Sequence, residues 1–92
     1  MAVAMETIYA RVGRVPRGHV TTYGDLSPGA ARYAGRALAQ MPAGLPWWRV
    51  VRSDGTWPKG DEQRARLLAE DVPIRGNRVV MSQARIPPEA IL

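Results

Sequence analysis

The 92-residue chain contains no cysteine and only one histidine, His19. The lack of cysteine excludes disulfide bonds, cysteine-ligated iron–sulfur clusters and a thiol nucleophile. Zinc sites in proteins draw mainly on cysteine and histidine, so one histidine argues against a zinc centre. We therefore expect no metal ion and no other cofactor, and we assign His19 to a solvated turn.

Long apolar runs are missing as well. No stretch of the chain approaches the ~18 residues that a membrane-spanning helix requires. The N-terminal segment lacks the basic residues and the apolar core of a secretory signal peptide. We expect a cytoplasmic protein with no membrane partner.

Positive charge is in excess, with 13 Lys and Arg residues against 8 Asp and Glu residues and a net charge of +5. Such a balance suits an anionic partner such as a nucleic acid. The length predicts one small domain over residues 1–92, which buries roughly 60–65% of its unfolded surface. No segment resembles a dimerisation helix, so we expect a monomer.

Apolar periodicity predicts a first helix over residues 5–12, which Gly13 and Pro16 then end. Residues 20–21 are predicted to be extended, and Thr22 to cap a short helix over residues 23–26.

A second long helix is predicted over residues 28–40, with Ser27 as its N-cap and Pro28 at its first position. On a helical wheel Arg32 and Arg36 lie on the outer face with Gly35 between them. Such a face suits close approach to a nucleic acid, although a solvated basic face fits the wheel equally well. The residues predicted to face inward are Ala30, Ala31, Ala34, Ala37, Leu38 and Met41.

The second half predicts a strand over residues 49–52 and a turn over residues 53–55. Asp61 is predicted to cap a helix whose apolar face carries Ala65, Leu68, Ala69 and Val72. A two-residue hairpin is predicted around Gly76 and Asn77.

The last segment, residues 82–92, shows no clear period, and we expect flexibility there. Together these elements predict a mainly α fold with short β strands, a winged helix-turn-helix domain.

Three ordered segments carry a family resemblance: residues 15–26, residues 27–38 and residues 45–55. They resemble the active domain of the O6-alkylguanine-DNA alkyltransferases. The most informative run is Pro46-Trp47-Trp48-Arg49, which matches the Pro-Cys-His-Arg segment that holds the family's acceptor cysteine. Trp47 therefore stands at the cysteine position and Trp48 at the histidine position, as in a member of the alkyltransferase-like group.

The resemblance implies a fold like the C-terminal domain of those enzymes, without their reaction. Alkyl transfer to sulfur needs a thiolate, usually activated by a neighbouring base, and an indole nitrogen is a donor with no free lone pair. What remains is binding of O6-alkylguanine in duplex DNA through the minor groove with base flipping. Nucleotide excision repair proteins are the further partners that the resemblance implies, at a nucleoid-associated location.

Site residues follow from the same resemblance. Arg32 matches the family's arginine finger, and Tyr23 matches the tyrosine that crowds the 3′ phosphate and promotes rotation of the base. Trp47 is expected to form a wall of the pocket and Trp57 to enclose the base, whereas Trp48 is expected either to line the pocket or to pack in the core. The full expected set is Tyr23, Trp47, Trp48 and Trp57 around the lesion, and Arg32, Tyr23, Thr22, Gly35, Arg36, Arg17, Arg52 and Lys59 on DNA.

Two further expectations concern the surroundings of the pocket. Arg49 is expected to pair with a carboxylate behind the pocket, with Glu70 as the candidate. Met41 stands where the family has an Asn, so the hydrogen bonds of that turn must come from elsewhere.

Other functions remain open at this level. A winged-helix transcription regulator would use Arg32 and Arg36 to read undamaged DNA, usually as a dimer on spaced half-sites. Without the family context, Trp47 and Trp48 would be read as core residues, because tryptophan is mostly buried. A hydrolase is disfavoured, since Ser53 and Asp54 in a turn with one distant histidine do not form a nucleophile and base.

Overall fold

The computed structural model describes residues 3–92. Helix α1 (Met5–Arg14) packs its buried Ile8 and Val12 into the interior, and Met5 and Tyr9 lie half-buried beside them. All four are the residues whose spacing predicted this helix, so the predicted inner face is confirmed.

A helix-turn-helix follows strand β1 (Thr21–Thr22): helix α2 (Tyr23–Leu26), a turn, and helix α3 (Ala31–Ala39). The Thr22 hydroxyl accepts a hydrogen bond of 3.0 Å from the Asp25 N–H, which confirms the predicted cap. The predicted start of α3 was wrong by three residues, counted from Pro28 to Ala31. Gly29 has a φ of 76°, outside the helical region, so Ser27 and Pro28 belong to the turn and do not start the helix.

The inner face of α3 was predicted only in part. Ala34 and Ala37 are fully buried, and Leu38 and Met41 pack against the same core while remaining partly accessible. Ala31 is exposed instead, because it lies in the first turn of the helix, where no other element covers it.

The second half begins with the 3-10 turn η1 (Trp47–Arg49) and strand β2 (Val50–Val51), so the strand is shorter than predicted. Strand β2 pairs in parallel with β1, in the register Thr21 with Val50 and Thr22 with Val51. Helix α4 (Gly60–Ala69) follows, and then the antiparallel hairpin of β3 (Ile74–Arg75) and β4 (Arg78–Val79), which was predicted correctly.

The predicted inner face of α4 was wrong for three of its four residues: Val72 is buried, whereas Ala65, Leu68 and Ala69 are exposed. Asp61 lies in the first turn without capping the helix, Leu68 is 44% exposed, and the buried residues are Gln63 and Leu67. Gln63 is buried because its amide satisfies backbone groups: it donates to the carbonyls of Trp48 (3.1 Å) and Val50 (2.8 Å). A pattern based on apolar residues does not identify a polar core residue of this kind.

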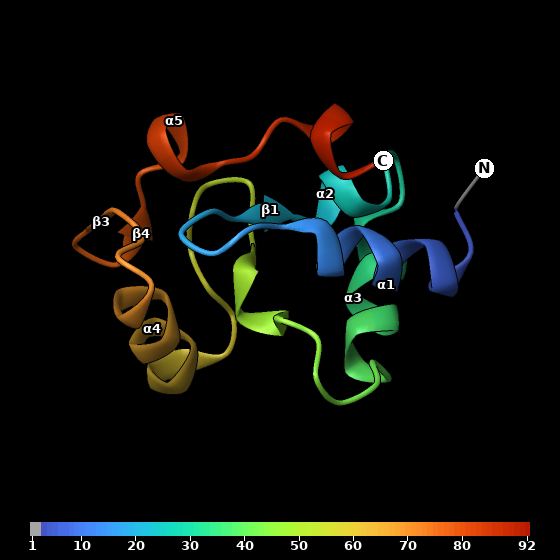
Figure 1. Cartoon of the computed structure of the whole chain (residues 1–92), viewed down its shortest axis with the longest axis horizontal. Helices are drawn as coiled ribbons and strands as arrows, with labels where there is room; N and C mark the ends of the chain where they lie inside the picture. The colour runs from blue at the N-terminus through green and yellow to red at the C-terminus, as the bar shows by residue number, and fades with distance from the viewer. Residues whose placement is uncertain (1–2) are drawn as a thin grey trace.

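The C-terminal segment is ordered, in contrast to the expected flexibility over residues 82–92. It contains helix α5 (Met81–Ala84) and the 3-10 turn η2 (Pro88–Ile91). The backbone of Val20 bonds to Ala84 (3.0 Å) and to Ile86 (2.9 Å), and Ile91 is fully buried. The segment thus runs back along the top of the molecule in Figure 1, and η2 packs against α1.

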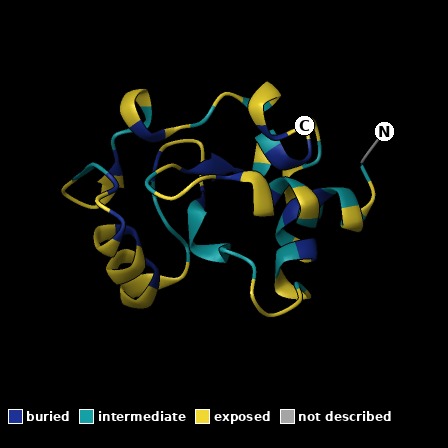
Figure 2. Cartoon of the chain, viewed as in Figure 1, coloured by how far each residue is buried: buried dark blue, intermediate teal, exposed yellow. Residues whose placement is uncertain are grey.

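Two apolar cores lie on either side of the β1–β2 pair. The first joins α1, α2, α3 and η2, and the second joins α4, the hairpin and α5. Val50 belongs to the first core and Val51 to the second, because successive residues of a strand point in opposite directions. Figure 2 shows buried residues along the central strand, with exposed residues concentrated on the outer face of α4.

No helix within residues 3–92 is both long enough and apolar enough to cross a membrane.

Candidate nucleic-acid interface

A cavity of about 470 Å³ opens where helices α2 and α3 face the segment after β2. We call it the Arg32 cavity. Its basic lining residues are Arg32, Arg52 and Lys59, and Tyr23 lies among them. Gly35 lines the cavity too, so the structure brings together five residues that were assigned to DNA binding from the sequence. The remaining lining residues are Gly24, Ala31, Ser53 and Pro58.

Local structure places Tyr23 and Arg32 at the starts of their helices. Tyr23 is the first residue of α2, directly after the capping Thr22, and Arg32 is the second residue of α3. Partial burial raises the pKa of Tyr23, and the positive charge of Arg52 opposes this shift only in part. The tyrosine therefore stays a neutral hydroxyl at physiological pH and can donate a hydrogen bond.

The surface of α3 beside Arg32 is made of small residues. Ala31 is exposed, and a Cβ built on Gly35 meets no atom within 4 Å. No side chain caps the N-terminus of α3, where Ala30 holds the cap position. Uncapped N–H groups and the helix dipole favour an anion at this end.

A second cavity of about 330 Å³, the Trp47 pocket, shares Tyr23 and Lys59 with the Arg32 cavity. Its other lining residues are Leu38, Trp47 and Glu62. Leu38 was assigned to inward packing alone, and Glu62 was not singled out at all. Only the fold brings α3, η1 and α4 to one place, so no local signal identifies these two residues.

The neighbouring Trp47 and Trp48 rings meet edge to face, with ring centroids 6.0 Å apart and an interplanar angle of 87°. Both rings also border a third cavity of about 470 Å³, which we call the Arg66 cavity. Trp48 packs against the second core as well. Of the two alternatives that the sequence left open, Trp48 thus takes the inward packing, and it lines the Arg66 cavity but not the Trp47 pocket. The Arg66 cavity is completed by Leu38, Met41, Pro42, Ala43, Gly44, Leu45 and Arg66.

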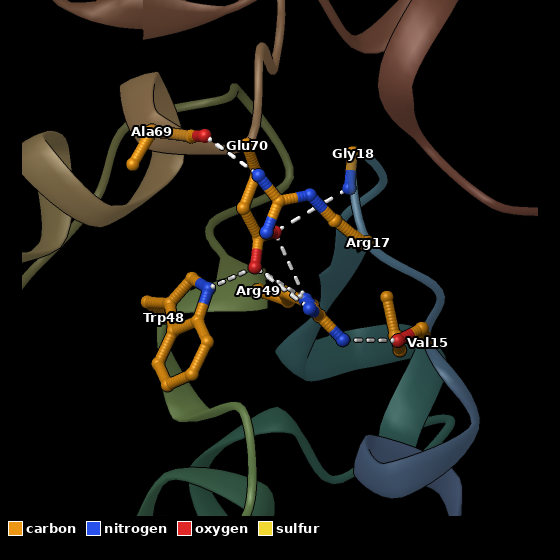
Figure 3. Close-up of polar contacts among 7 residues, drawn as sticks. All are labelled: Val15, Arg17, Gly18, Trp48, Arg49, Ala69 and Glu70. Carbon is orange, nitrogen blue, oxygen red and sulfur yellow. Dashed lines mark hydrogen bonds and ion pairs between the residues drawn. The ribbon is translucent and has the colours of Figure 1, made fainter.

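Behind the tryptophans, Glu70 accepts hydrogen bonds from three parts of the chain (Figure 3). Arg49 reaches it at 2.7 Å, the Trp48 indole N–H at 2.9 Å and the backbone N–H of Gly18 at 3.4 Å. Arg49 also donates to the carbonyl of Val15 at 2.8 Å. The predicted pairing of Arg49 with Glu70 is confirmed, and it ties η1 to the end of α4 and to the loop after α1.

Glu70 remains ionised although its side chain is buried. Burial alone raises the pKa of the carboxyl, but the hydrogen bonds from Arg49, Trp48 and Gly18 outweigh it and bring the pKa below its ordinary value. Glu70 is thus ionised over the whole neutral range.

Four of the expected site residues line none of the three cavities. Trp57 packs against the second core and lines none of the three cavities, because the turn that carries it is tied to β4. Arg17 donates to the carbonyl of Ala69 at 3.0 Å, beside the Glu70 cluster (Figure 3). Thr22 is buried and serves as the cap of α2. Arg36 is exposed on α3 beyond the lining of the Arg32 cavity.

Within residues 3–92, no group of three or more acidic or histidine side chains is close enough together to hold a metal ion.

Residues 4–72 match the sequence model of the family described as 6-O-methylguanine DNA methyltransferase, DNA binding domain. Among curated relatives, a DNA base-flipping protein of Escherichia coli (strain K12) is 42% identical in an 83-residue alignment that covers 78% of this chain and 64% of the relative. The chain thus spans about 64% of the length of that relative. Alkyltransferase-like protein 1 of Schizosaccharomyces pombe is 35% identical, over 73% of this chain and 74% of the relative.

Solved structures agree on the fold. A crystal structure of S. pombe Atl1 in complex with damaged DNA containing O6-carboxymethylguanine has a TM-score of 0.80 at 28% identity, covering 91% of this chain and 94% of that chain. A second structure of the S. pombe protein in complex with DNA gives a TM-score of 0.81. The predicted class, a mainly helical domain with short strands, is confirmed by this match. On the sequence model and the relatives together, the chain belongs to the family of the 6-O-methylguanine DNA methyltransferase DNA-binding domain.

Proposed function

We propose that this chain is a non-enzymatic sensor of O6-alkylguanine in duplex DNA. It binds through the minor groove, flips the modified base into the Trp47 pocket and holds the DNA for repair by other proteins. The observation that carries the proposal is the convergence of Tyr23, Arg32 and Trp47 on two adjoining cavities.

The Arg32 cavity supplies the contact with the duplex. Arg32, Arg52 and Lys59 offer three cations around one opening, and phosphate contacts of this kind position a protein without reading sequence. The small side chains of Ala31 and Gly35 let α3 approach the groove closely. Arg32 extends from this surface, which suits insertion into the base stack in place of the flipped guanine.

The Trp47 pocket receives the base. Stacking of a base on an aromatic ring contributes about 1–3 kcal/mol, and Leu38 adds an apolar surface for the alkyl group. Rotation of a base out of the duplex costs a few kcal/mol and costs least at a damaged pair. An alkylated guanine is therefore favoured over guanine both by its weaker pairing and by its added apolar contact.

No alkyl transfer follows binding. Trp47 stands where the family's acceptor cysteine stands, and the indole N–H of Trp48 is already bonded to Glu70 at 2.9 Å. Neither side chain supplies a lone pair that could attack carbon or take up a proton. The complex therefore persists, and we propose that nucleotide excision repair proteins recognise it in the cytoplasm, at the nucleoid.

The test compares the affinities for two matched duplexes, one with guanine and one with O6-methylguanine, at fixed salt. We expect at least tenfold tighter binding of the damaged duplex and no loss of its methyl group. Trp47→Ala should remove most of this preference, whereas Trp57→Phe, which changes an indole outside the cavities, should retain it. Equal affinity for the two duplexes would overturn the proposal and favour a regulator that reads undamaged DNA.

A further inference from the structure

The Arg66 cavity combines an apolar lining with one cation. Leu38, Met41 and Leu45 contribute apolar side chains, and the guanidinium of Arg66 enters from α4. The guanidinium carbon lies 4.9 Å from the Trp48 ring centroid and 5.6 Å from the Trp47 ring centroid. The two rings therefore hold the guanidinium at the cavity wall.

Cation–π contacts do not use up the five N–H donors of a guanidinium, so N–H groups stay available for hydrogen bonds. Arg66 has an ion pair with Glu62 at 3.5 Å, in which the side chains are 46% and 68% exposed. Exposed pairs one helical turn apart are weak, so another carboxylate can take the place of Glu62.

The Arg66 cavity adjoins the Trp47 pocket. Leu38 and Trp47 line both spaces. A substituent on a base that lies against Trp47 can therefore extend past the ring edge into the space beside Arg66. A methyl group is too short to reach that space, whereas a longer substituent extends into it.

We infer that Arg66 is a specificity-determining residue, which selects O6-alkyl groups that end in a carboxylate. The alkyl chain lies on Leu38 and Trp47, and the carboxylate receives two N–H bonds from Arg66. This inference rests on the proposed function, because it assumes that the base occupies the Trp47 pocket.

Two other charged groups face the same region, and their effects on carboxylate binding must be distinguished from the effect of Arg66. Lys59 and Glu62 both line the Trp47 pocket. Lys59 is an alternative partner for a carboxylate, and Glu62 competes with the carboxylate for Arg66.

The experiment uses the full chain and three duplexes that differ only at one guanine: O6-methyl, O6-carboxymethyl and O6-carbamoylmethyl. The last two have nearly the same size and differ in charge. The measured quantity is the ratio of their dissociation constants, for the natural chain and for Arg66→Met, Arg66→Lys, Lys59→Met and Glu62→Gln. Arg64→Met, an exposed arginine on the same helix, is the matched control. Thermal unfolding of each variant checks that the fold is retained.

The natural chain should bind the carboxymethyl duplex about five- to tenfold more tightly than the carbamoylmethyl duplex, as expected for a charge-assisted, partly exposed pair. Arg66→Met should abolish this ratio, Arg66→Lys should retain part of it, and Glu62→Gln should increase it. Arg64→Met should leave the ratio as it is.

A ratio that survives Arg66→Met, or one that disappears in Lys59→Met instead, would overturn the assignment to Arg66. The O6-methyl duplex separates this failure from failure of the proposed function. If the natural chain prefers O6-methylguanine to guanine but shows no charge selectivity, only the present inference fails.

Discussion

The indole N–H of Trp48 and the carboxylate of Glu70 form a hydrogen bond of 2.9 Å, on the same carboxylate that Arg49 holds at 2.7 Å. Two neighbouring residues of η1 are thereby fixed to the end of α4. Because Trp47 precedes them directly, the cluster also sets the position of the pocket wall. Stability and binding are therefore connected through Glu70.

Glu70→Gln should destabilise the fold strongly. The Glu70 side chain is 6% exposed, and removal of one partner leaves the Arg49 guanidinium buried without a counter-charge. Loss of one member of a buried pair costs roughly 3–5 kcal/mol, and the partial exposure of Arg49 favours the lower end. The free energy of unfolding in urea measures the loss. Glu62→Gln, which breaks an exposed pair, should cost less than about 1 kcal/mol.

The same carboxylate predicts how stability depends on pH. The pKa of Glu70 is lower in the folded chain than in the unfolded chain, where it is about 4.3. The contribution of Glu70 is therefore fully present above about pH 5 and decreases as pH falls through the folded pKa. Urea unfolding from pH 3 to 7 measures the free energy of unfolding of the natural chain and of Glu70→Gln. The difference between the two free energies should decrease only at the acid end of this range. A constant difference would contradict the lowered pKa.

Arg32→Ala should weaken binding to the O6-methylguanine duplex by about 2 kcal/mol or more, which is roughly thirtyfold. The side chain is exposed on α3, so the melting temperature should not change. Arg64→Ala removes an equal charge from α4, outside the three cavities. The affinity lost in this variant measures the nonspecific electrostatic contribution of one positive charge to DNA binding. Equal losses in the two variants would remove the special role of Arg32.

Trp47→Cys should not restore alkyl transfer. The new thiol would lie beside Trp48, whose N–H is bonded to Glu70 and which has no basic nitrogen to activate it. Incubation with a duplex that carries a radiolabelled O6-methyl group should leave the label on DNA. Label on the protein would show that activation by a neighbouring base is not required in this pocket.

Gly55→Ala should destabilise the second core. Gly55 has a φ of 89°, and a Cβ there would lie 2.5 Å from the carbonyl oxygen of Val79. Gly60 has a φ of 68° but open space around a Cβ, so Gly60→Ala isolates the backbone strain of roughly 1–2 kcal/mol. The loss on Gly55→Ala should exceed that of Gly60→Ala in urea unfolding. Equal losses would mean that β4 moves away without cost.

The sequence predicted the features that local chemistry determines. The inner face of α1, the Thr22 cap and the hairpin at Gly76 each depend on residues close together in the chain. The pairing of Arg49 with Glu70 spans 21 positions and came from the family resemblance.

The errors have a common physical origin in tertiary contacts. Gln63 is buried because distant backbone carbonyls need a donor, and the C-terminal segment is ordered because Val20 bonds to it on both sides. Arg66 went unnoticed for the same reason. On a helix with several charged residues it resembles any exposed arginine, and only the fold places it against two indole rings.

The distribution of the three tryptophans has a practical consequence. Trp47 and Trp48 border the cavities, whereas Trp57 packs against the second core. A base that enters the Trp47 pocket lies against the Trp47 indole and leaves the surroundings of Trp57 as they were. Base flipping should therefore change the intrinsic tryptophan fluorescence of the chain, which can be followed without an attached dye.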